Sequence, residues 1–372
     1  MEELLDLNIE DWFNKNFQNK LFGRRIIYEQ ISSLLDNLPP SNFSLIKLGN
    51  SYQGLPINSV KIGSGQIKIM LWSQMHGNES TGTKAIFDLF KFFKNSGNLT
   101  GIHHKILQNC TLLFLPMLNP DGALAYTRVN AQNIDLNRDV IDLKAPESNI
   151  LHSVLKDFAP HYCFNLHDQR TIFSVGNDNN TATISFLAPS EDELRLVTAG
   201  RKETMKVIVA MQKLLQKIIP NKIGRYTDEF YPTATGDNFQ RAGHNTILIE
   251  SGHYKNDYDR EISRKYTFIG ILQGLYSIAN GLDCISYKPY FKIPNNEKFY
   301  LDIIIKNATF QSKKTDIGIV YKEIIKDNSL IFEPYIERFD DLSGYNANLI
   351  INNNDLIFKN NNEVIEYIKK NT

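Results

Sequence analysis

Two hydrophobic patterns alternate along the chain from Phe43 to Gly281. Apolar runs of strand length stand at 67–74, 110–118, 161–167, 182–189 and 245–251. Apolar residues recur at helical spacing at 83–96, 147–158, 191–218 and 259–282. Such alternation is typical of the α/β class, so we predict a mixed, largely parallel twisted sheet flanked by helices.

The two ends of the chain have a different character. Residues 1–42 have the pattern of polar, amphipathic helix, and the next thirty or so form short β runs broken by glycine and asparagine, which favour hairpins. After Cys284, β-like runs alternate with polar turns to the end of the chain. We therefore predict a first domain at 1–284, with a helical part at 1–42, and a small β-rich C-terminal domain at 285–372 whose role the residues leave open.

Composition narrows the class of protein without naming a function. The 372 residues are 42% hydrophobic and carry 41 basic and 41 acidic side chains, so the formal net charge is zero. Neutral charge gives no reason to expect nucleic acid or an anionic membrane as a partner. No apolar run approaches the roughly 18–20 residues of a membrane span, and the acidic N-terminus does not resemble a secretory signal. We expect a cytoplasmic protein with three free thiols, since its cysteines form no CxxC motif.

Chemistry-bearing residues follow the buried runs. The first run leads into His76 and Glu79, the second into the motifs NPDG and DLNRD, the third ends in His167, and the last carries Glu250. Ligands of an open α/β sheet bind beyond the carboxyl ends of its strands, so these residues are expected to face one crevice.

A metal site is the interpretation that accounts for these residues together. Taken alone, His76 and Glu79 would more often be a surface or capping pair, and His167 a histidine satisfied within the core. Together, two histidines and a carboxylate form a familiar catalytic zinc set that leaves room for water. Glu250 is then placed to act as a base, because a carboxylate at the end of a buried strand is costly without a partner or a task. A salt-bridged Glu250 is the alternative.

As a set, these motifs resemble the M14 zinc carboxypeptidases. HGNE, NPDG, DLNRD, the strand-terminal histidine and ILIESG occur in the order of that family, over roughly Phe43 to Gly281. The resemblance implies one Zn²⁺ per chain, held by His76, Glu79 and His167, with Glu250 as the general base. It also implies a peptide, or another small carboxylate-bearing molecule, as substrate.

Further roles follow from the same resemblance. Asn137 and Arg138 would bind the terminal carboxylate of the substrate, because a planar guanidinium pairs bidentately with a carboxylate. Arg128 would hold the oxyanion. Asp135 would orient His76, with a solvated loop aspartate as the alternative.

Three more residues are expected at the substrate. Tyr231, with Tyr226 as second choice, corresponds to the family's mobile tyrosine. Asp237 falls near the end of the side-chain pocket, where it would favour basic side chains, although an aspartate following a glycine is also ordinary turn chemistry. Arg170, in the unusual stretch HDQRT, would add a positive charge and favour an acidic substrate.

Other functions stay open at this level. An N-acyl amino acid deacylase of the aspartoacylase and succinylglutamate desuccinylase type shares HGNE and a C-terminal β domain. A murein-peptide amidase is intermediate between this deacylase and a carboxypeptidase. A catalytically inactive binding module is the alternative from another class. The oligomeric state does not follow from the sequence.

Overall fold

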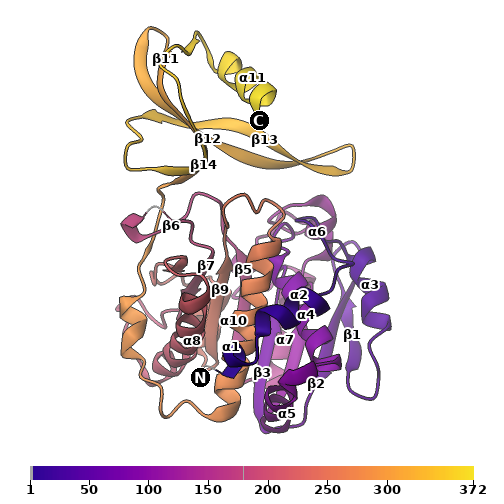
Figure 1. The fold of residues 1–372 in the computed structure, drawn as a ribbon. Helices are drawn as coiled ribbons and strands as arrows, with labels where there is room; N and C mark the ends of the chain where they lie inside the picture. Colours follow the sequence, from indigo (N-terminus) through magenta and orange to yellow (C-terminus); the bar gives the residue numbers. More distant parts are fainter. Residues whose placement is uncertain (1–2, 179) are drawn as a thin grey trace.

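The computed structural model describes residues 3–178 and 180–372, which form an α/β unit with a β-rich unit above it (Figure 1). A sheet of eight strands runs through the α/β unit in the order β1-β2-β4-β3-β5-β9-β7-β8. Its middle strands β4, β3, β5 and β9 are parallel, so their carboxyl ends meet at one edge. These strands are β1 (Ser44–Asn50), β2 (Pro56–Ile62), β3 (Ile67–Trp72), β4 (Cys110–Leu115), β5 (Tyr162–Asp168), β7 (Ile184–Leu187), β8 (Ile223–Arg225) and β9 (Asn245–Ser251).

Helices cover both faces of this sheet because its strands are apolar on both sides. In β3, Ile69 and Leu71 enter one buried cluster while Met70 and Trp72 enter another, as expected from side chains that alternate between faces. The larger cluster lies under α2 (Ile9–Asn16), α3 (Tyr28–Asp36), α4 (Thr81–Lys94), α5 (Thr100–Asn109), α8 (Ala199–Ile218) and α10 (Glu261–Asn280). The smaller one lies under α7 (Pro146–Phe158) and α9 (Thr235–Arg241). The short helices α1 (Glu3–Asp6) and α6 (Pro120–Ala125) complete the unit.

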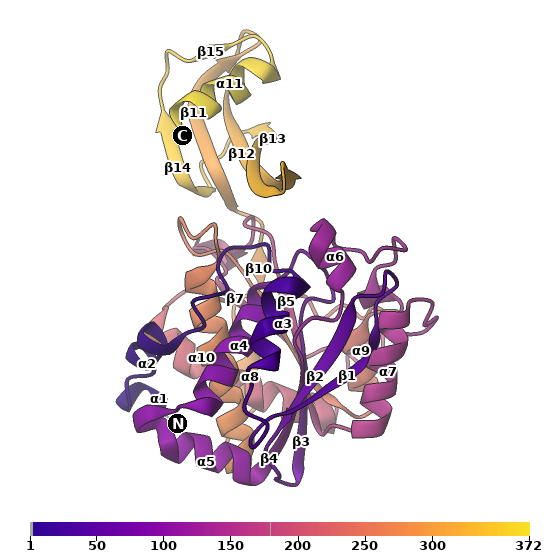
Figure 2. The ribbon, with the colours of Figure 1, turned by 90° about the vertical axis from the view of Figure 1, so that its right-hand side faces the viewer.

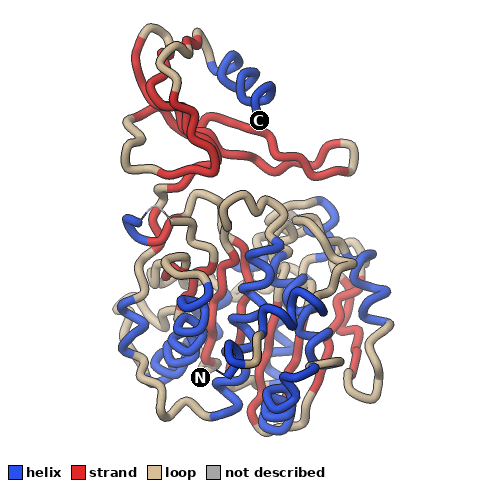
Figure 3. The backbone as a smooth tube through the Cα atoms, in the orientation of Figure 1, coloured by secondary structure: helices blue, strands red, loops and turns tan. Residues whose placement is uncertain are grey.

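The C-terminal unit, mostly strand in Figure 3, is a second sheet in the order β13-β12-β11-β14, with β15 beside β11. Its elements are β11 (Tyr300–Phe310), β12 (Lys313–Lys326), β13 (Ser329–Asp340), β14 (Asn346–Asn352), β15 (Ile357–Phe358) and α11 (Asn361–Asn371). Helix α11 covers one face, where Val364 and Ile368 pack on Ile303 and Ile317. Figure 2 shows this unit from the side, joined to the first by a narrow connection.

Residues between the two sheets belong to the first one by their packing. Ile285, Tyr290 and Ile293 lie in the larger buried cluster of the α/β unit. The short strand β10 (Asn296–Glu297) pairs with β6 (Ser174–Val175) of that unit. The predicted domain boundary at residue 285 therefore precedes a segment that packs on the first unit. The C-terminal sheet begins after that segment, with β11.

The predicted fold class is confirmed, with local differences. The helix expected from residue 191 begins at Ala199, because Arg195 has a left-handed backbone and the Thr198 side chain caps the helix by accepting from the Arg201 amide. The helical N-terminal part is interrupted between α2 and α3. Within the described residues, no helix is both long and apolar enough to cross a bilayer.

Candidate metal centre and active site

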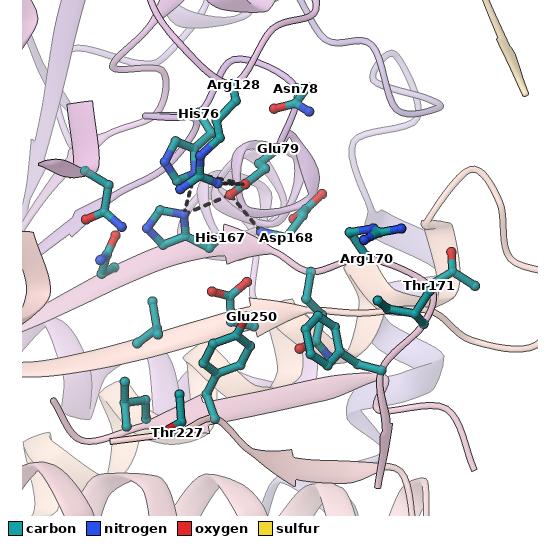
Figure 4. Close-up of a pocket in the computed structure, with 18 of the residues that line it drawn as sticks. His76, Asn78, Glu79, Arg128, His167, Asp168, Arg170, Thr171, Thr227 and Glu250 are labelled. Atoms are coloured by element: carbon teal, nitrogen blue, oxygen red, sulfur yellow. Dashed lines mark hydrogen bonds and ion pairs between the residues drawn. The ribbon is translucent and has the colours of Figure 1, made fainter. Parts of the chain in front are cut away.

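The residues picked out at the strand ends lie together at the carboxyl edge of the sheet (Figure 4). His76 and Glu79 stand in the loop between β3 and α4, and His167 is on β5. Glu250, on β9, pairs directly with His167 in the parallel register of the two strands. All four line a cavity of about 800 Å³.

Three of them form a compact cluster, called the metal cluster below: His76, Glu79 and His167. Their ligand atoms all lie within 4.8 Å of one another, and all three side chains are buried. His76 Nδ1 is 2.9 Å from Glu79 Oε1, and His167 Nδ1 is 2.8 Å from Glu79 Oε2. The two histidine Nδ1 atoms are 3.1 Å apart.

This geometry suits a cation. Two nitrogens bound to a tetrahedral zinc at about 2.0–2.1 Å lie about 3.3 Å apart, close to the separation of the two Nδ1 atoms. Burial would raise the pKa of Glu79, but the neighbouring histidines hold it well below its usual range, so the carboxylate is charged. Burial lowers the pKa of His167, which keeps a lone pair available. The triad is therefore a possible metal-binding site of the predicted composition.

Asp135 sets the orientation of the first histidine. It lies before the short helix η2 (Leu136–Arg138), and its Oδ1 is 3.0 Å from His76 Nε2. A proton on Nε2 donated to Asp135 leaves the lone pair of Nδ1 free to bind a metal ion beside Glu79 and His167. Burial acts against ionisation of Asp135, but the bonds to His76 and Arg128 outweigh it and lower the pKa of the carboxyl.

Arg128 reaches the same cluster from the loop after α6. Its Nε donates to Asp135 Oδ2 at 3.0 Å, and its Nη1 lies 3.4 Å from Glu79 Oε1. About half of the side chain is exposed. A guanidinium that is anchored on one side and open to the cavity on the other can donate to an oxygen of a bound molecule.

Glu250 has a different environment from Glu79. Burial raises the pKa of Glu250 well above its usual value, and the nearby carboxylates of Glu79 and Asp168 add to the effect. Among the described residues, no hydrogen bond or ion pair to the Glu250 carboxylate is found. A carboxyl without a structural partner, facing a cavity beside a metal cluster, has the properties of a proton acceptor.

A second group of residues lies on η2 and around α9. Asn137 accepts a hydrogen bond from the Thr235 amide through Oδ1 at 3.1 Å, which leaves its side-chain NH₂ to donate. The Arg138 guanidinium lies 5.5 Å from the centre of the Tyr231 ring. All three side chains line the cavity, as does Tyr226, the second choice for the tyrosine.

Asp237 lies on α9 and also lines this cavity. It is 6% exposed and accepts a hydrogen bond from the Tyr231 amide at 3.3 Å. Burial raises the pKa of Asp237 to about 6. Asp237 therefore lies in the first turn of a helix rather than in a loop turn, and it is a titratable group at the cavity wall.

Arg170 faces the C-terminal unit. Its Nη2 donates to the Tyr335 hydroxyl at 2.9 Å, and Glu337 lies 3.8 Å away. The sequence did not predict the other residues at this end of the cavity. The main ones are Arg24 and Glu323, which form an ion pair at 2.9 Å. No local pattern marks either, because their contact joins residues almost 300 positions apart in two different units.

Part of the chain is similar in sequence to known carboxypeptidases. Residues 28–209 match the family described as zinc carboxypeptidase. Carboxypeptidase 2 of Trichophyton tonsurans is 30% identical over 170 residues, which cover 44% of this chain and 28% of that protein. Carboxypeptidase SOL1 of Arabidopsis thaliana is 29% identical over 129 residues, covering 30% of this chain and 26% of the relative. The chain thus aligns with under a third of the length of these relatives.

Solved structures show the same fold. The carboxypeptidase A from Helicoverpa armigera superposes with a TM-score of 0.56 at 17% identity, covering 75% of this chain and 81% of that one. A metallo-carboxypeptidase from Burkholderia cenocepacia gives a TM-score of 0.52 at 16% identity, covering 67% of each chain.

The α/β unit thus has the fold of known metallocarboxypeptidases, and its buried His-Glu-His triad is a possible metal site. The sequence match to the zinc carboxypeptidase family lies in the first domain, over just under half of the chain.

Proposed function

We propose that this chain is a zinc-dependent carboxypeptidase that hydrolyses the C-terminal amide bond of peptides. The observation that carries the proposal is the convergence, in one cavity, of the metal cluster and the Glu250 carboxyl, which has no partner in the described part of the chain. Asn137 and Arg138, with free donors for a terminal carboxylate, line the same cavity.

His76, Glu79 and His167 would hold the zinc ion. When bound, zinc would polarise the scissile carbonyl and lower the pKa of the attacking water. The donor set fits this role, because two imidazoles and one carboxylate leave a coordination position for water.

The protein's own residues carry the remaining steps. Glu250 takes a proton from the attacking water and returns it to the leaving amine. Arg128 donates to the carbonyl oxygen as negative charge develops on it. Asn137 and Arg138 bind the terminal carboxylate, and Tyr231 covers it from the Arg138 side. The raised pKa of Glu250 makes its carboxylate a better proton acceptor than that of an ordinary glutamate.

Substrate preference follows from Asp237. A carboxylate at the cavity wall attracts a basic side chain when it is charged, so peptides ending in lysine or arginine are the expected substrates above about pH 6.

The test is mass spectrometry of a mixed panel incubated with the zinc-loaded protein, with Glu250→Gln as the blank. The panel holds peptides with free and amidated C-termini, muropeptides and N-acyl amino acids. Loss of single C-terminal residues from free-ended peptides alone supports the proposal. Cleavage of amidated peptides at the same rate, or no turnover, contradicts it.

A deacylase of N-acyl amino acids is the second candidate. Two observations favour it: the C-terminal unit lines the cavity, as in a compact small-molecule site, and Arg170 adds a positive charge there. Deacylation in the panel with every peptide intact would select this function.

A further inference from the structure

The cavity that holds the metal cluster is not built by the first domain alone. Part of its wall comes from the C-terminal unit, and most of these residues lie on the hairpin formed by β12 and β13 (residues 313–340). The contributing residues are Lys298, Asp302, Val320, Tyr321, Lys322, Glu323 and Tyr335. Figure 1 shows the hairpin extended across the top of the first domain, above the carboxyl edge of its sheet.

A buried ion pair fixes the hairpin over the cavity. Glu323 of β12 pairs with Arg24 at 2.9 Å, and the Arg24 side chain is only 8% exposed. The hydroxyl of Tyr126 donates to the same carboxylate. A buried guanidinium that loses its carboxylate is strongly unfavourable, so this contact holds the hairpin in one position.

Apolar packing and an outer contact hold it at two further points. Ile172, close after the ligand His167 on the chain, packs in one cluster with Leu301 and Val320 of the C-terminal sheet. At the hairpin's turn, Arg25 donates to the backbone and side-chain oxygens of Asn328 at 3.0 and 2.9 Å. The hairpin is therefore attached near its base, along its length and at its end.

These attachments lie away from the residues assigned to the terminal carboxylate. Asn137 and Arg138 belong to η2, which contacts α9 within the first domain. The hairpin instead meets Arg24, Tyr126 and Arg170. Figure 4 shows Arg170 and Thr171 on one side of the metal cluster, beyond Asp168.

We propose that the β12–β13 hairpin closes the active-site groove on the N-terminal side of the scissile bond. The chain then acts on short peptides rather than on the ends of long or folded ones. The direction of the substrate in this inference rests on the proposed carboxypeptidase function, whereas closure by the hairpin does not. A cavity of about 800 Å³ lies within the range of about 300–1,000 Å³ typical of sites for small ligands, which suits a peptide of a few residues.

Closure is tested without any substrate, by a thiol placed under the hairpin. Thr171→Cys is made together with Cys284→Ser, which removes the exposed native thiol; Cys110 and Cys163 are buried. Iodoacetamide and a maleimide carried on a small folded protein are compared on this variant, with Cys284 of the unaltered chain as the reference. We expect both reagents to modify Cys284, and only iodoacetamide to modify the thiol at position 171. Equal modification of that thiol by both reagents would overturn the proposal.

The consequence for substrates is tested with a peptide ladder. Alanine peptides of two to ten residues with a C-terminal lysine are compared by kcat/KM on the zinc-loaded protein. We expect the ten-residue peptide to be at least about tenfold poorer than the three-residue one. Tyr335→Ala, which shortens a side chain of the hairpin, should improve the long peptide more than the short one. Lys369→Ala is the matched control, since Lys369 pairs with Glu333 in the same unit and does not line the cavity.

The two measurements separate the two hypotheses. A flat ladder would overturn the length limit even if the peptides are cleaved. If no peptide of any length is cleaved, the proposed function fails, and the thiol reaction still decides whether the hairpin closes the groove.

Discussion

The metal cluster and the β12–β13 hairpin bound the same cavity but are held in place by different means. His76, Glu79 and His167 sit at or just beyond the ends of neighbouring parallel strands, and all three are buried with their ligand atoms within 4.8 Å of one another. The hairpin belongs to another sheet and reaches the cavity through one buried ion pair, one apolar cluster and exposed contacts such as that of Arg25.

The difference suggests that the cluster and the hairpin have separate roles, one in catalysis and one in substrate selection. Groups that perform chemistry must be held to within a fraction of an ångström, which neighbouring strands of one sheet can do. Groups that limit what enters need only occupy space, and a second unit attached at a few points is sufficient for that. Changes in the cluster should therefore abolish turnover, whereas changes in the hairpin should alter which substrates are accepted.

The largest effect is expected for Glu250→Gln. The amide keeps the shape of the side chain but cannot accept the proton of water, so kcat should fall by roughly 10²–10⁴-fold. Bound zinc, measured by atomic absorption, should stay at the wild-type level because Glu250 is not in the cluster. Near-normal turnover would remove Glu250 from the role of base.

Asp135→Asn should act on the metal rather than on the proton transfer. An amide no longer fixes the proton of His76 on Nε2, and loss of such a partner typically costs about 10–100-fold in metal affinity. Zinc competition with a chromophoric chelator measures this change. Unchanged affinity would mean that Asp135 serves only the loop and Arg128.

Glu323→Ala tests the attachment of the hairpin through the free energy of unfolding of the chain. It leaves the buried Arg24 guanidinium without its carboxylate, and we expect a loss of about 1–3 kcal/mol in the free energy of unfolding, below the ~3–5 of a fully buried pair because Glu323 is partly exposed. Urea unfolding followed by circular dichroism gives the value. A change no larger than that of Lys369→Ala would show that the ion pair does not hold the hairpin.

The smallest effect is a pH dependence of selectivity at Asp237. Its pKa of about 6 in the folded chain lies above the usual 3.8, so the carboxyl is neutral below about pH 6 and charged above it. The ratio of kcat/KM for peptides ending in lysine and in leucine should rise through this pH by about fivefold, the equivalent of ~1 kcal/mol. Asp237→Asn should flatten the profile, and an unchanged profile in that variant would exclude Asp237 as its source.

The sequence predicts the metal cluster far better than the hairpin. Each ligand of the cluster follows an apolar run, and the parallel arrangement of those runs brings the residues to one edge by a general rule of α/β sheets. Two regions deviate from the prediction. Helix α8 starts later because Arg195 has a left-handed backbone, and the residues around β10 follow Ile285, which packs on the first domain. Hydrophobic periodicity contains no signal for either feature.

The contribution of the C-terminal unit could not be predicted for a physical reason. The pair of Arg24 and Glu323 depends on how two sheets dock, and neither residue has a distinctive neighbour in the chain. The same holds for Arg170, whose contact with Tyr335 joins a loop of one sheet to a strand of the other. Local patterns determine which strands form, but not which surfaces meet.

The measurement that tests the central claim most directly is zinc stoichiometry coupled to activity. The chain is stripped with a chelator, titrated with zinc, and assayed on a short free-ended peptide beside its amidated twin, with His167→Ala as the comparison. We expect one zinc per chain and activity on the free-ended peptide restored at one equivalent, and neither in His167→Ala. Full activity in the stripped chain, or equal zinc binding by His167→Ala, would contradict it.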